Sequence, residues 1–135
     1  MKKIFKTGLF VLTILFWSAC AEEDPIEPDT DAREKFLGTW SVQEKIGGQV
    51  TGAYQSEVTN DAGNTSRISI GNIFNLGAGS SVKAVVAGSS LDISEQVVTG
   101  ITIQGSGLFS GERFTLNYSA NDGTGAQTVE AVYSK

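Results

Sequence analysis

The sequence predicts an all-β fold, a small antiparallel meander barrel of about eight strands preceded by a short N-terminal helix. Three observations predict it. From residue 38 onward apolar and polar residues alternate with a period of two, as they do in strands with one buried face. Segments rich in Gly, Asn and Asp separate these runs, and such residues form the turns that join antiparallel neighbours. Both prolines precede residue 29, so none interrupts the strands.

The elements follow in order along the chain. A short helix is expected from Asp31, as its N-cap, to Leu37, with Gly38 ending it. Turn signals lie at 46–49, 60–64, 77–80, 87–90, 110–112 and 121–125. The Gly-Ser-Gly stretch at 105–107 precedes no helix and predicts a bulge or a bend of the sheet. The inward-facing positions are expected to be Trp40, Val42, Val58, Ile68, Ile70, Val82, Val86, Leu91, Ile93, Ile101, Ile103, Phe114 and Leu116.

Strands of this number and spacing form either a sandwich or a barrel. Closure into a barrel is favoured, because an open meander would leave two long edges exposed to aggregation. About 100 residues (36–135) are enough for one domain with one core.

The N-terminus reads as a signal peptide over residues 1–19. Three lysines precede an apolar run at 8–17, which is about ten residues long. A transmembrane helix needs about 20 apolar residues, so this run is too short to be a permanent span. Small residues at 18 and 19 lead to Cys20, the single cysteine of the chain.

Cys20 is the predicted lipidation site. It has no partner for a disulfide, and it stands at the edge of a cleaved segment. The stretch Ser18-Ala19-Cys20 resembles the end of the bacterial lipobox, with Trp17 where Leu is usual. The resemblance implies a thioether-linked lipid, palmitate among its chains, that anchors the protein to a membrane without spanning it.

Residues 20–35 are predicted to form a flexible acidic tether, because acids and prolines bury too little apolar surface to fold. A plain spacer explains this composition. The acids at 22–24 also resemble the export signal that directs Bacteroidota lipoproteins to the outer leaflet. The expected location is the outer membrane, at the cell surface rather than facing the periplasm.

The domain itself resembles lipocalin-like proteins. The stretch Phe36-Leu37-Gly38-Thr39-Trp40 is similar to their opening, a short helix followed by Gly-x-Trp in the first strand. The order of motifs over 36–135 resembles small Bacteroidota lipoproteins with lipocalin-like, calycin-type domains. The resemblance implies that Trp40 packs across the closed end of the barrel. The last strand has no Arg to cover this Trp.

Catalysis is not expected. The chain has no histidine, and its cysteine lies outside the domain, so the usual general base, metal ligand and thiol nucleophile are missing. Eight carboxylates remain in the domain, most at outward strand positions or in turns. Asp61 and Asp122 lie in turns shaped by backbone needs, with calcium as a secondary alternative. No cofactor and no metal site is predicted.

Two functions stay open. The barrel either binds a small apolar ligand, with Trp40, Tyr54, Phe114 and Tyr118 as candidate interior residues, or is filled by its own side chains. A filled barrel would be a surface interaction module, such as an envelope-complex subunit, glycan binder or enzyme inhibitor, acting through the loops at 60–65 and 121–126. Exposed aromatics would favour the second function, with Tyr54, Phe74 and Phe109 as candidates. The domain carries 8 acids against 5 bases, which excludes nucleic acid as a partner.

Overall fold

The computed structural model describes residues 31–135. The predicted signal peptide (1–19), Cys20 and the tether up to residue 30 lie outside the described residues. Within the described part, no helix has the length and apolar character needed to cross a membrane.

Eight strands and two single-turn 3₁₀ helices make up this part of the chain. In order they are η1 (Glu34–Phe36), β1 (Gly38–Ile46), β2 (Gln49–Asn60), β3 (Arg67–Gly71), η2 (Ile73–Asn75), β4 (Ser81–Ala87), β5 (Ser90–Val98), β6 (Ile101–Ser110), β7 (Arg113–Asn121) and β8 (Ala126–Ser134).

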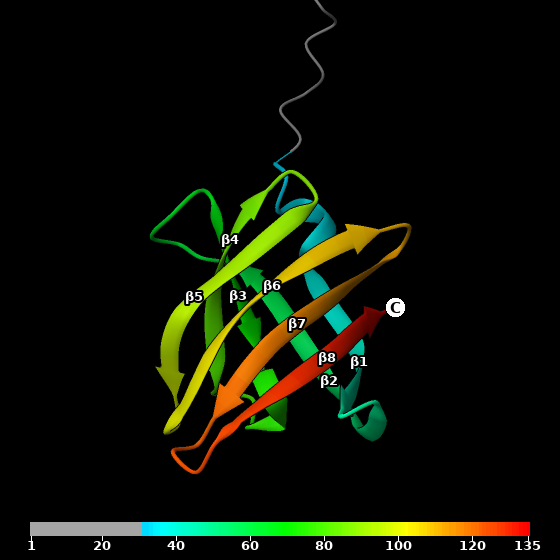
Figure 1. Ribbon diagram of the computed structural model, residues 1–135. Coiled ribbons are helices and arrows are strands. Elements are labelled where there is room, and N and C mark those ends of the chain that lie inside the picture. Colours follow the sequence, from blue (N-terminus) through cyan, green and yellow to red (C-terminus); the bar gives the residue numbers. More distant parts are fainter. Residues whose placement is uncertain (1–30) are drawn as a thin grey trace, which may run out of the picture.

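The strands form a closed antiparallel barrel. Each strand pairs with the next one along the chain, and β8 pairs with β1 to close the sheet (Figure 1). The junction of β2 with β3 is short, because it joins only Val58–Asn60 to Ile68–Ile70. The predicted meander of eight strands is confirmed, and closure rather than a sandwich is the outcome.

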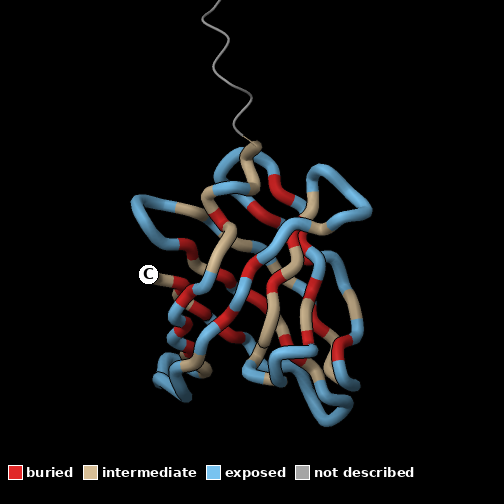
Figure 2. The backbone as a smooth tube through the Cα atoms, turned by 180° about the vertical axis from the view of Figure 1, so that it is seen from behind, coloured by how far each residue is buried: buried red, intermediate tan, exposed pale blue. Residues whose placement is uncertain are grey.

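The core lies inside the barrel and is formed by the inward-facing side chains of the eight strands. Figure 2 shows buried positions alternating with exposed ones along the strands, while the connecting loops are exposed. All residues predicted to face inward are buried except Ile101, which opens β6 at one end of the barrel and is partly buried. Period-two alternation predicted the core correctly because each strand has one face inside.

One end of the barrel is closed by η1 and an aromatic group. Trp40 Nε1 donates a hydrogen bond to the Phe36 carbonyl oxygen at 2.8 Å, and both side chains are buried. Lys135 covers the Trp40 ring, in place of the Arg that the last strand lacks. Its Nζ lies 4.4 Å from the centre of the Trp40 ring and donates to the Leu37 carbonyl at 3.0 Å. The expectation that Trp40 packs across a closed end agrees with this geometry.

Residues 31–35, which the sequence assigned to a flexible tether, are fixed against the barrel. Arg33 pairs with the Asp31 carboxylate and donates from one guanidinium nitrogen to the carbonyl oxygens of Asn64 and Arg67, at 3.1 and 3.2 Å. The helix is also shorter than predicted. Asp31 accepts the backbone N–H of Arg33 at 3.0 Å, and only the single 3₁₀ turn of η1 follows before Gly38 begins β1.

The Gly-Ser-Gly stretch lies in the middle of β6. An added Cβ at Gly105 would stand 2.3 Å from the Asn117 carbonyl oxygen and 2.5 Å from Tyr118. A bulge or bend of the sheet was predicted here, and the register shift lies beside Gly105 in the neighbouring strand, between Ile93 and Gln96 of β5. The glycines therefore let β7 approach closely while β5 carries the irregularity.

Candidate functional site

The four predicted interior residues divide between the two ends of the barrel. Trp40 and Phe114 pack edge to face at the η1 end, with ring centres 4.9 Å apart. Tyr54 and Tyr118 lie toward the other end, where both of their hydroxyls reach the carboxylate of Glu44. The sequence therefore named residues of two groups, one aromatic and one polar, which Tyr133 connects by stacking on Phe114.

Glu44 is the centre of the polar group. Its side chain is only 5% exposed, and its Oε1 accepts hydrogen bonds from Tyr54 and, at 2.8 Å, from Tyr118. Oε2 accepts no hydrogen bond from any residue in the range 31–135. No Lys or Arg of that range forms an ion pair with Glu44.

Tyr133 completes the group, so that all three tyrosines of the chain surround one carboxylate. Its side chain is fully buried, its hydroxyl lies near Tyr54 and Ser56, and its ring stacks on Phe114 with ring centres 4.3 Å apart. We call Glu44, Tyr54, Tyr118 and Tyr133 the tyrosine–glutamate cluster.

Burial sets the protonation of the tyrosines. Removal from water is the largest cause raising the pKa of each above its ordinary value of about 10. The Glu44 carboxylate raises all three further, and for Tyr54 the other two tyrosines add to the effect. The three hydroxyls therefore stay protonated at neutral pH, and those of Tyr54 and Tyr118 donate to Glu44.

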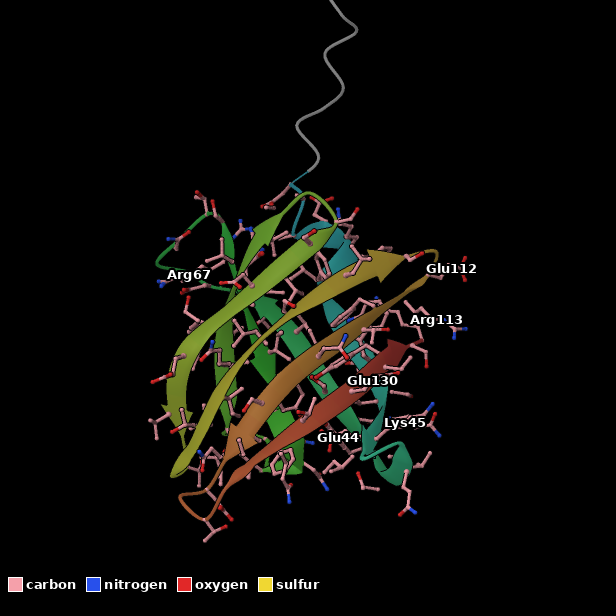
Figure 3. The ribbon with its side chains drawn as sticks, viewed as in Figure 1. Glu44, Lys45, Arg67, Glu112, Arg113 and Glu130 are labelled. Carbon is pink, nitrogen blue, oxygen red and sulfur yellow. The ribbon has the colours of Figure 1, made fainter. Side chains whose placement is uncertain are left out.

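Sequence reasoning missed Glu44, although a signal for it was present. Trp40, Val42 and Glu44 stand two residues apart in β1 and share the inner face. Lys45 takes the opposite face and extends outward (Figure 3). A charge was assumed to be solvated because ionised groups avoid burial unless they are paired. The alternation of inward and outward positions along β1 predicted the burial of Glu44 better than its residue type did.

The 3₁₀ turn η2 covers the barrel end near the cluster. Its Phe74 packs edge to face on Tyr118, with ring centres 6.3 Å apart. Asn72, Phe74 and Asn75 all have φ between 51° and 55°. This left-handed conformation is unfavourable for side chains larger than glycine, above all for Phe, and such strain is concentrated at ligand clamps and switch regions.

A small hollow of about 70 Å³ opens beside η2. Its wall contains Phe74, Ile101 and Ala120, and its rim is formed by the β7–β8 turn with Asp122 and Thr124. We call it the mouth hollow. Phe74 belongs both to this hollow and to the contact with Tyr118, so the hollow and the cluster have this ring in common as a neighbour.

A second, lateral groove lies where β2 departs from β3. It holds about 270 Å³ and is lined by Thr39, Gln55, Ser56, Glu57, Gly71, Asn72 and Ala78. Asn72 bridges it by donating from Nδ2 to the Gln55 carbonyl at 2.8 Å, and the Ser56 hydroxyl donates to the Gly71 carbonyl at 2.7 Å. Its lining is mixed polar and apolar, and it opens in the barrel wall between β2 and β3.

The aromatics considered for the outer face do not form an exposed set. Tyr54, Phe74 and Phe109 are each partly buried. Tyr54 contacts Glu44, Phe74 contacts Tyr118, and Phe109 packs on Phe36 with ring centres 5.5 Å apart. The exposed large apolar residues of the described range are Val50, Val85, Val97 and Leu108.

The turn carboxylates are engaged locally. Asp61 pairs with Arg67 at 2.9 Å and accepts the Gly63 N–H, and Asp122 accepts both the N–H and the hydroxyl of Thr124. These interactions lower the pKa of both aspartates, the bond from Gly63 being the main cause for Asp61 and the Thr124 hydroxyl for Asp122. Within residues 31–135 no three His, Cys, Asp or Glu side chains gather as metal ligands.

Fold and site together define a closed eight-stranded antiparallel barrel, apolar inside, with a tyrosine–glutamate cluster near one covered end. No family model and no curated protein sequence matches the chain. Its fold does match solved structures of redesigned β-barrels.

Two of these barrels are described as bound to DFHBI. EF1p2_mFAP2b has a TM-score of 0.58 and 16% identity, over 78% of this chain and 97% of that one. The redesigned barrel mFAP1 has a TM-score of 0.57 and 17% identity, over 78% and 99% of the two chains. A third redesigned barrel, b11L5F_LGL, has a TM-score of 0.54 and 13% identity over 78% and 95%. At these identities the likeness shows the fold alone.

Proposed function

We propose that this chain is a lipid-anchored protein of the bacterial cell envelope whose barrel is a non-catalytic, lipocalin-like binding module. Its small ligand would enter at the end covered by η2. The observation that carries the binding role is the Glu44 carboxylate, buried beside three tyrosine hydroxyls with one oxygen unengaged by residues 31–135. The redesigned barrels of similar fold that are bound to DFHBI support the view that such a frame accepts a small molecule.

The anchor and location rest on the N-terminal sequence. Three lysines, an apolar run of signal-peptide length and a small-small-Cys ending favour lipidation of Cys20. The acids that follow favour the outer leaflet of a Bacteroidota outer membrane over the periplasmic side. The lack of histidine in the chain favours a binding role over catalysis.

Replacing Cys20 by Ser tests the anchor. A serine hydroxyl cannot form the thioether that carries the lipid, so we expect the variant to move from the membrane pellet to the soluble fraction. The measurement is the distribution between these fractions after cell disruption, with Ser18→Ala as the matched control, since a small residue is retained there. A variant that stays in the pellet as fully as the parent would contradict lipid anchoring.

A second function is favoured by a different observation. The apolar interior residues are almost inaccessible to solvent, and the lateral groove and the mouth hollow are lined mostly by residues outside this core. A barrel filled in this way would serve as a surface interaction module, an envelope-complex subunit, glycan binder or enzyme inhibitor. Its contact surface would be the lateral groove or the loops at 60–65 and 121–126.

Native mass spectrometry of the full chain, purified from its own envelope in a mild nonionic detergent, distinguishes the two functions. We expect an additional mass that stays with the folded barrel and is lost on unfolding, because a ligand held at Glu44 needs the folded cluster. The expected lipid on Cys20 is covalent and therefore remains after unfolding, which separates the two signals. A folded protein with no removable mass would favour the interaction module.

A further inference from the structure

The carboxylate of the tyrosine–glutamate cluster has no basic partner among residues 31–135. Glu44 itself is only 5% exposed. Burying a carboxylate is unfavourable unless a counter-charge or several hydrogen bonds offset the loss of water. Two tyrosine hydroxyls donate to Oε1, which leaves Oε2 as an acceptor directed at no described donor.

The surroundings of this carboxylate are aromatic. The hydroxyls of Tyr54 and Tyr118 reach it directly, Tyr133 lies close enough for Glu44 to raise its pKa, and Phe74 of η2 packs on the Tyr118 ring. Aromatic faces attract cations through the negative charge of the ring face, and methylated ammonium groups are the ligands that such cages recognise. A carboxylate together with several rings is therefore complementary to an organic cation.

The geometry points to a small organic cation, of the primary or methylated ammonium class, as the ligand held between Glu44 Oε2 and the surrounding rings. This inference rests on the proposed binding function and narrows it to one chemistry. The cation would enter through the mouth hollow by displacing Phe74, whose backbone is held in the unfavourable left-handed region at φ 54°. The hollow holds about 70 Å³, so only a small ligand fits without a larger rearrangement.

A metal ion suits this site less well. Calcium and magnesium require several oxygen ligands with more than one carboxylate as a rule, and no group of three potential ligands occurs in residues 31–135. An ammonium ion needs only one carboxylate when aromatic faces complete its surroundings. Such a ligand is a cation, in place of the purely apolar molecule expected from the sequence.

The test is an NMR titration of the full chain in a nonionic maltoside detergent, which carries no ammonium group of its own. The probes are tetramethylammonium chloride and tert-butanol, a neutral molecule of similar shape, at constant ionic strength set with sodium chloride. We expect tetramethylammonium to shift the amide signals of Phe74 and Tyr118 in a saturable manner. Tert-butanol should bind at least about tenfold more weakly, because it lacks the charge that Glu44 attracts.

Two matched carboxylate variants locate the site. Glu44→Gln keeps the size and a carbonyl acceptor for the tyrosines but removes the charge, and we expect about tenfold weaker binding or more. Glu112→Gln removes a charge from the exposed turn between β6 and β7, away from the mouth hollow, and binding should stay within about twofold. If Glu44→Gln bound the cation as tightly as the parent, the cation would not be held by this carboxylate and the inference would be wrong.

The outcomes distinguish a failure of the cation inference from a failure of the proposed binding function. Equal binding of both probes at Phe74 and Tyr118 would overturn the cation class and keep the binding barrel. Neither probe shifting these signals, together with no removable mass in native mass spectrometry, would overturn both. Should Glu44→Gln fail to fold, the difference between the two probes on the unaltered chain still decides the question.

Discussion

Replacement of Trp40 by alanine is expected to lower the free energy of unfolding by about 3–5 kcal/mol. The indole is 2% exposed and packs against Phe114 and Phe109, with ring centres 4.9 and 6.4 Å away. Its Nε1–H satisfies the Phe36 carbonyl at the end of η1. Truncation therefore opens a cavity, leaves a buried carbonyl unpaired and removes the surface on which Lys135 lies.

Chemical denaturation, followed by circular dichroism of the β-sheet, measures this effect. Val50→Ala is the control, because Val50 is 56% exposed and its truncation should change the free energy of unfolding by less than about 0.5 kcal/mol. A Trp40→Ala variant as stable as the parent would mean that the indole does not close the barrel, and a ligand-stacking role for Trp40 would then be open again.

Gly105→Ala should destabilise the barrel by about 3 kcal/mol, the upper part of the range for overpacked cores. The new Cβ would stand 2.3 Å from the Asn117 carbonyl oxygen and 2.5 Å from both Cα and Cβ of Tyr118. Backbone atoms cannot rotate away, so β6 and β7 must separate locally. Because Tyr118 donates to Glu44, the same shift also disturbs the tyrosine–glutamate cluster.

Gly52→Ala is the matched control for this prediction. Gly52 also lies inside a strand, β2, but an added Cβ there meets nothing within 4 Å. The control should be neutral, or stabilising by up to about 1 kcal/mol through the lower entropy of the unfolded chain. Equal melting curves for the two variants would show that β6 and β7 are not packed as closely as the structure places them.

The fold was largely predictable from sequence because barrels obey a local rule. A strand in a closed sheet has one face inside along its whole length, so Val82, Ala84 and Val86 reveal the buried face of β4 without knowledge of its neighbours. Turns were predictable for a similar reason. Gly47 and Gly48 adopt φ of 60° and 80° between β1 and β2, a conformation that glycine takes without strain.

The site was predictable only in part. Tyr54 and Tyr118 were expected inside, yet they stand 64 residues apart, and no local pattern says that they meet the same carboxylate. Glu44 was predicted wrongly because a glutamate is usually exposed to solvent, whereas its position in β1 places its side chain in the interior. The turn η2 was not predicted as a cover, since a strained turn with left-handed Phe74 has no preference that propensity can reveal.

The sequence by itself therefore determined the strands, their inner faces and the turns, while lipidation of Cys20 stays a prediction. These are properties of neighbouring residues, fixed by side-chain alternation, backbone preference and the order of charges. Only the tertiary structure decided that three tyrosines surround Glu44, that Lys135 covers Trp40, and that residues 31–35 belong to the folded unit. The physical reason is that closing the barrel brings β1 against β8, and contacts made by closure depend on register between distant segments.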